Sequence, residues 1–99
     1  MKFKINGTIH NVKSDSYRIV VCNARTGHML KKIDITRPND PRKTLPLKTY
    51  SGFFFMSEPE LVNVQLFDMR TGLMVNKLCV QPLGVEYDDT ASLQVDFQL

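Results

Sequence analysis

Apolar and polar side chains alternate through most of this chain, in short runs separated by turn residues. The clearest runs are residues 3–7, 17–21, 29–35, 62–66 and 93–99, and residues 53–55 and 73–80 add two apolar segments. Alternation with a period of two is typical of strands with one buried face, and no window repeats apolar residues at helical spacing for three turns. The pattern predicts an all-β fold, a two-sheet antiparallel sandwich of about seven strands.

The length of the chain limits how many domains it can form. With 99 residues, 42% of them hydrophobic and 23% charged, the composition is that of one ordinary globular domain. No linker or low-complexity tract divides the sequence. We therefore expect residues 1–99 to form a single β-sandwich domain.

Two stretches are predicted to be connections between strands. Residues 36–43 read TRPNDPRK, and residues 81–90 read QPLGVEYDDT. Proline has no N–H to donate to a sheet ladder, and Asn, Asp and Gly favour turns. The second stretch also gathers Glu86, Asp88 and Asp89. Because the spacing of a calcium loop is absent, we interpret this cluster as a solvated turn rather than a cation site.

The sequence contains an internal repeat. Residues 20–29 align with residues 65–74, and both copies carry Asn or Asp followed by Arg-Thr-Gly and then Met. Asn and Asp open turns by bonding their own backbone, and Gly takes the positive φ that closes them. The repeat predicts two pseudo-equivalent hairpins with positive φ at Gly27 and Gly72. Arg25 and Arg70 are then either two equivalent contact points or exposed residues of the turn.

The residues that usually carry chemistry do not form a motif. Nucleophile, phosphate-loop, dinucleotide and zinc-protease patterns are all missing. Cys22 and Cys79 lack the spacing of a zinc site, even with His10 and His28, and we favour reduced, buried thiols over a disulfide. The sequence predicts neither a catalytic site nor a metal or other cofactor.

Charge is divided unevenly along the chain. Residues 1–50 hold eleven basic and three acidic residues, a net charge of +8, whereas residues 51–99 hold two basic and seven acidic residues, a net charge of −5. Three interpretations remain: head-to-tail assembly of basic and acidic surfaces, ordinary scattered surface charge, or nucleic-acid binding. We disfavour the last because exposed aromatics among basic residues are not evident and residues 53–55 are predicted to be core. The candidate interaction residues are Arg25, Arg70, Lys31, Lys32, Arg37, Arg42, Lys43, Glu86, Asp88 and Asp89.

Several segments together resemble a known kind of module. They are Ile5-Asn6-Gly7-Thr8-Ile9, the strand that begins at Arg18, the turn Arg25-Thr26-Gly27 and the run Gly52-Phe53-Phe54-Phe55. Their order resembles the carboxypeptidase-regulatory-like, transthyretin-like β-sandwich domains of tailed-phage virion proteins, over about residues 3–67. The resemblance implies an Ig-like or transthyretin-like sandwich with a structural or attachment role. The second Arg-Thr-Gly hairpin is not part of that pattern.

The expected function is therefore non-enzymatic. We expect a structural or interaction protein, a small phage capsid or tail subunit that decorates or joins, with itself or other capsid or tail proteins as partners. One alternative is a module that binds carbohydrate or a host surface, with Tyr50 and Tyr87 as its aromatic platform. Another is a small inhibitor of a host protein. No apolar run reaches membrane-spanning length and no signal peptide is evident, so we expect assembly into a virion in the host cytoplasm.

Overall fold

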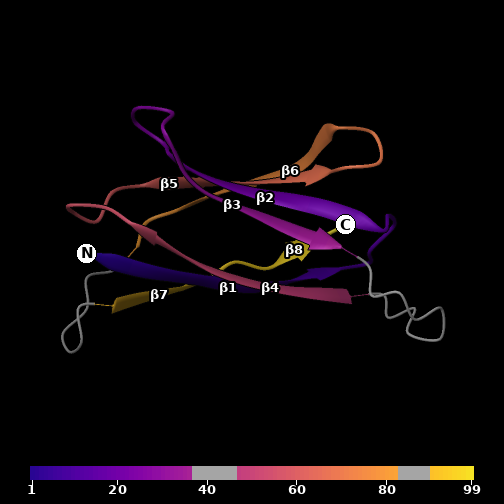
Figure 1. The fold of residues 1–99 in the computed structure, drawn as a ribbon, viewed down its shortest axis with the longest axis horizontal. Coiled ribbons are helices and arrows are strands. Elements are labelled where there is room, and N and C mark those ends of the chain that lie inside the picture. The colour runs from indigo at the N-terminus through magenta and orange to yellow at the C-terminus, as the bar shows by residue number, and fades with distance from the viewer. Residues whose placement is uncertain (37–46, 83–89) are drawn as a thin grey trace.

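The computed structural model describes residues 1–36, 47–82 and 90–99, and these residues form eight strands and no helix (Figure 1). The strands are β1 (Lys2–His10), β2 (Ser16–Asn23), β3 (Met29–Thr36), β4 (Leu47–Phe55), β5 (Val62–Asp68), β6 (Leu73–Val80), β7 (Thr90–Gln94) and β8 (Phe97–Gln98). Because most of these runs alternate in polarity, most strands can turn one face to a core and the other to water.

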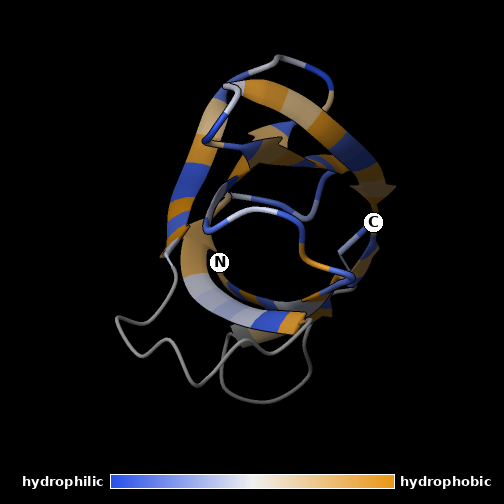
Figure 2. Ribbon diagram, turned by 90° about the vertical axis from the view of Figure 1, so that its right-hand side faces the viewer, coloured by the Kyte–Doolittle hydropathy of each residue, from blue (hydrophilic) through white to orange (hydrophobic). Residues whose placement is uncertain are grey.

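The strands form two sheets that pack face to face, as the sequence predicted. One sheet has the order β4-β1-β7 with β8 also paired to β1, and the other has the order β3-β2-β5-β6. Viewed end on, the sheets curve around a shared interior, and hydrophobic and hydrophilic bands alternate along the strands (Figure 2). We call them the β1 sheet and the β2 sheet.

The pairing of β1 differs from the prediction of a purely antiparallel sandwich. β1 is antiparallel to β4 but parallel to both β7 and β8. The single run predicted over residues 93–99 is in fact interrupted between β7 and β8, which explains the eighth strand. Val95 and Phe97 both stay buried across the interruption, so the alternation of polarity gives no sign of it.

The core lies between the two sheets and is built from their inward side chains. Rings of Phe3 on β1 and Phe54 on β4 stack with centroids 5.3 Å apart and planes 13° apart. The other buried apolar side chains in the cluster are Ile5, Ile9, Tyr17, Ile19, Val21, Ile35, Tyr50, Met56, Val62, Val64, Leu66, Ala91, Leu93, Val95 and Phe97. Fully burying such side chains contributes about 1.5–3 kcal/mol each before the entropy of ordering is subtracted.

The two hairpins of the β2 sheet are related by a pseudo-two-fold axis, as the repeat predicted. Val20 pairs with Gln65, its equivalent in the repeat, so the axis passes between them. A register shift follows Val21 in one hairpin and Leu66, its repeat equivalent, in the other. φ is +77° at Gly27 and +75° at Gly72. The repeat in sequence is therefore a repeat in structure.

Gly7 marks the closest approach of two chain segments. A Cβ atom at Gly7 would lie 1.8 Å from the carbonyl oxygen of Val95 and 2.8 Å from the hydroxyl of Tyr50. The Tyr50 hydroxyl donates a hydrogen bond to that same carbonyl oxygen. The Val95 amide in turn donates to the carbonyl of Asn6 at 2.9 Å. Only glycine leaves room for this crossing at the break between β7 and β8.

Candidate interaction surfaces

The two Arg-Thr-Gly turns lie at opposite ends of the β2 sheet (Figure 1). β2 and β5 are antiparallel neighbours, with Tyr17 opposite Asp68 and Asn23 opposite Val62. The turn after β2 is therefore at the end where β5 begins. Arg25 and Arg70 do not come together, so they cannot form one continuous site.

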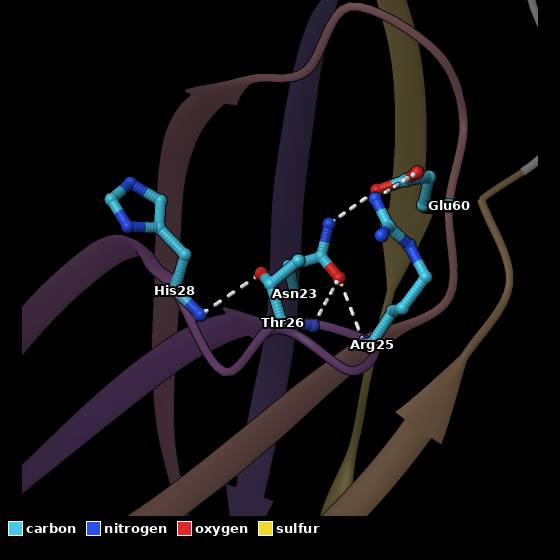
Figure 3. Close-up of polar contacts among 5 residues, drawn as sticks. All are labelled: Asn23, Arg25, Thr26, His28 and Glu60. Carbon is cyan, nitrogen blue, oxygen red and sulfur yellow. Dashed lines mark hydrogen bonds and ion pairs between the residues drawn. The ribbon is translucent and has the colours of Figure 1, made fainter.

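The first turn is tied to the segment that precedes β5 (Figure 3). The Asn23 side-chain oxygen accepts hydrogen bonds from the amides of Arg25 at 2.8 Å and Thr26 at 3.2 Å, and its amide nitrogen donates to Glu60. The Arg25 guanidinium lies 3.2 Å from the Glu60 carboxylate. These two contacts, the Asn23 hydrogen bond first, hold the pKa of Glu60 below its ordinary value. Arg25 thus has a role within the fold.

The second turn has the same arrangement, with Asp68 in the position of Asn23. The Asp68 carboxylate accepts a hydrogen bond from the Arg70 amide at 2.9 Å, and the Gly72 amide closes the turn on the Asp68 carbonyl at 2.8 Å. A hydrogen bond from the Ser14 side chain, followed by the contributions of Arg70, lowers the pKa of Asp68. The Arg70 side chain is exposed. The two arginines therefore occupy equivalent positions but have different surroundings.

The predicted basic residues of β3 point to opposite faces of the strand. Lys31 is opposite Val21, which is buried, and Lys32 is opposite Val20. On the same outer face as Lys32, Arg18 and Asp34 form an ion pair of 2.7 Å. The hydrogen bond from Arg18, with a smaller contribution from Lys32, lowers the pKa of Asp34. The remaining predicted interaction residues, Arg37, Arg42, Lys43, Glu86, Asp88 and Asp89, lie outside the described residues.

β6 is an edge strand with apolar side chains exposed on both faces. Leu73 is 66% exposed, Val75 is 43% exposed and Leu78 is 37% exposed. Leu78 is opposite buried Val64 and so shares its inward face. In the described part of the chain, β5 is the only strand that pairs with β6. The sequence predicted this run as a strand but did not indicate that its apolar side chains are exposed.

The outer face of the β1 sheet carries a second surface, which the sequence analysis missed. Residues 53–55 were predicted to be core, but this is right only for Phe54. Phe53 is 43% exposed and Phe55 is 67% exposed. Strand geometry is the reason, since successive side chains point to opposite faces and Phe54 takes the inward position. Lys2 and Lys4 lie on the same outer face, opposite Phe55 and Phe53 respectively.

Tyr50 does not provide the aromatic platform suggested for a carbohydrate-binding module. It is buried and its hydroxyl is bonded to Val95. Burial, with a smaller effect of the Asp96 charge, raises its pKa far above the ordinary value for tyrosine. The other tyrosine proposed for that platform, Tyr87, lies outside the described residues.

The two cysteines flank one residue on the outer face of the β2 sheet. Cys22 is opposite Asn63 on β5, and Asn63 is opposite Cys79 on β6. Two strand spacings of about 4.8 Å each place the Cα atoms of the cysteines about 9.6 Å apart. A disulfide joins Cα atoms that are no more than about 7 Å apart. Both thiols are free, and they are less buried than predicted, with Cys79 exposed and donating to Asn63 at 2.7 Å.

Comparison of the chain with known protein families, curated proteins and solved structures found no match. The resemblance to phage virion modules therefore stays a prediction. Among the described residues, no three His, Cys, Asp or Glu side chains gather closely enough to hold a metal ion. No helix that could cross a membrane occurs in residues 1–36, 47–82 or 90–99.

Proposed function

We propose that this protein is a non-enzymatic assembly subunit that joins a second copy of itself by strand addition along β6. The exposed apolar edge of β6 is the observation that carries the proposal. The resemblance to virion modules makes a phage capsid or tail the proposed setting of such a subunit.

A comparison with β3 shows why β6 is unusual. The two strands hold equivalent positions at opposite edges of the β2 sheet. β3 carries Lys31, Lys32 and Asp34, and β4 lies against it. Charges and a covering strand are the usual means of blocking a free sheet edge. β6 has a single charge, Lys77, so it lacks most of this protection.

A second copy offers a matching edge of its own. Two β6 strands related by a two-fold axis would pair antiparallel, and each would satisfy free backbone groups of the other. Any register that keeps Lys77 from facing its own copy avoids a repulsion between like charges. The contact would consist of backbone hydrogen bonds and apolar side chains, so salt would weaken it little.

Sedimentation velocity over a concentration series, at low and high salt, tests this proposal. We expect a monomer–dimer equilibrium that persists at high salt. Leu73→Lys and Val75→Lys should each shift it toward monomer by placing a charge on the edge. Leu61→Lys is the matched control, since Leu61 is 44% exposed but lies before β5 rather than on β6.

Two results would refute the β6 dimer. One is a monomer at every concentration and salt. The other is association that disappears at high salt and ignores both β6 variants, which would point instead to contact between basic and acidic surfaces.

A further inference from the structure

The outer face of the β1 sheet presents two lysines on β1 beside two phenylalanines on β4. Lys2 is directly opposite Phe55, and Lys4 is directly opposite Phe53. We call these four residues the Lys–Phe platform. Along each strand the two side chains are two residues apart, which is about 6.8 Å. The platform therefore offers two cations and two rings within one continuous patch.

Contacts within the platform leave one ring open. The Lys2 ammonium lies 4.3 Å from the centroid of the Phe53 ring, a cation–π contact that orders both side chains. Phe55 is the more exposed of the two rings. A planar ligand can therefore stack on Phe55 while an anionic group of the same ligand approaches Lys2.

The backbone beneath the platform is firmly held. β1 is hydrogen-bonded on both sides, to β4 and to β7. On the inward face, directly between the platform positions in sequence, Phe3 and Phe54 stack against each other in the core. A site on paired strands over a packed core is ordered before a ligand arrives, which lowers the entropic cost of binding.

The surrounding charge and polarity also suit one class of ligand. Ser92 is opposite Lys4, and Gln94 is opposite Asn6, so polar groups border the platform. Asp96 is the one acid on this face among the described residues. Its carboxylate accepts a hydrogen bond from the amide of Thr8 at 2.9 Å, further along β1. The platform itself holds only positive charge.

We propose that the Lys–Phe platform binds single-stranded nucleic acid, with a base stacked on Phe55 and phosphates bound by Lys2 and Lys4. Sequence-tolerant single-strand binding needs these two elements, a basic track and stacking rings. A flat strand surface has no helix or ribbon to enter the groove of a duplex. A carbohydrate would leave the positive charge unused, and an acidic peptide would leave the rings unused.

Fluorescence anisotropy with labelled oligothymidine and oligouridine tests the proposal. We expect Phe55→Ala to weaken binding about 5- to 150-fold, the effect of losing one base stack. The double variant Lys2→Gln/Lys4→Gln should lower the slope of log affinity against log salt by about 1.4, since each single-strand phosphate contact contributes about 0.7.

Matched controls separate the platform from general surface effects. Leu61→Ala removes an apolar side chain that is 44% exposed, close to the 43% of Phe53, and that lies before β5, outside both the platform and β6. Lys13→Gln/Lys32→Gln removes the same charge at two exposed lysines that lie outside both the platform and β6. Both controls should bind the oligonucleotides like the unmodified protein. Thermal unfolding of each variant confirms that it is folded.

Three results would overturn the proposal. The first is no binding to either oligonucleotide at low salt. The second is equal weakening by the control pair and the platform pair, which would indicate nonspecific attraction. The third is binding of polyglutamate as tight as that of oligothymidine and unchanged by Phe55→Ala, which would assign the surface to acidic proteins. Because β6 lies on the other sheet, these outcomes are independent of dimerisation.

Discussion

Of the glycines Gly7, Gly27, Gly52 and Gly72, Gly7 should tolerate replacement by alanine least. The added Cβ would lie 1.8 Å from the carbonyl oxygen of Val95, a backbone atom that cannot rotate away. Either β1 or the segment between β7 and β8 must move. That movement also breaks the hydrogen bond that Tyr50 donates to the same carbonyl.

The magnitude follows from these two effects. Forcing an extra methyl group into packed surroundings costs about 1–3 kcal/mol. Leaving a buried carbonyl without its donor costs about 1–3 kcal/mol more. The lower entropy of the unfolded alanine variant returns less than about 1 kcal/mol. We expect Gly7→Ala to lower the free energy of unfolding by about 1–6 kcal/mol, compared with the 5–15 kcal/mol typical of a domain.

Urea denaturation followed by circular dichroism measures this change. Gly52→Ala is the control, because its Cβ would meet the flexible end of the Ile33 side chain at 2.9 Å rather than backbone. Tyr50→Phe should cost about 1–3 kcal/mol alone but less in the Gly7→Ala background, where its hydrogen bond is already lost. Surface substitutions usually change the free energy of unfolding by less than about 0.5 kcal/mol. A Gly7→Ala protein whose free energy of unfolding differs from the original by no more than this would refute the reasoning.

Three further predictions concern the β2 sheet. Gly27→Ala and Gly72→Ala should each cost about 1 kcal/mol in urea denaturation, and equally, because both positions have positive φ and open space around the missing Cβ; clearly unequal costs would contradict the pseudo-symmetry of the turns. The pKa of Asp68 is lowered in the folded state, so its contribution to stability is present above the unfolded pKa and is lost as pH falls through the folded one; Asp68→Asn should therefore flatten the loss of thermal stability below about pH 4, and an unchanged pH profile would exclude this role. Non-reducing electrophoresis should show no intramolecular disulfide, and a thiol reagent should modify exposed Cys79 before Cys22, whose pKa is raised by burial; the reverse order would contradict the placement of the two thiols.

Most strand positions could be predicted because apolar and polar side chains alternate along them, whereas β4 (Leu47–Phe55) was predicted only over residues 53–55. The run 73–80 matches β6 in full, and the repeat correctly predicted both turns. The parallel pairing of β1 could not be predicted, since neither partner strand carries a mark of strand direction. The break at Val95 was hidden for a similar reason, because buried residues continue on both sides of it.

The surfaces could be predicted less well than the fold. Three consecutive phenylalanines leave open which of them points inward, and only the pairing of β4 with β1 assigns Phe54 to the core. Likewise, the sequence of β6 reads as a strand but does not say that it lies at an edge. Exposure depends on which strands are neighbours, and sequence alternation describes each strand by itself.

The parallel pairing of β1 with β7 and β8 has a consequence for how the chain folds. The contact between the Thr8 amide and Asp96 joins residues 88 apart in sequence, whereas each Arg-Thr-Gly hairpin closes within a few residues. Closing a loop of this length delays the formation of a sheet. The two Arg-Thr-Gly hairpins of the β2 sheet should therefore form early and the β1 sheet late. Until residues 90–98 are synthesised, one side of β1 has no partner strand. During that time the positive charges of Lys2 and Lys4 would oppose pairing of β1 with other nascent chains.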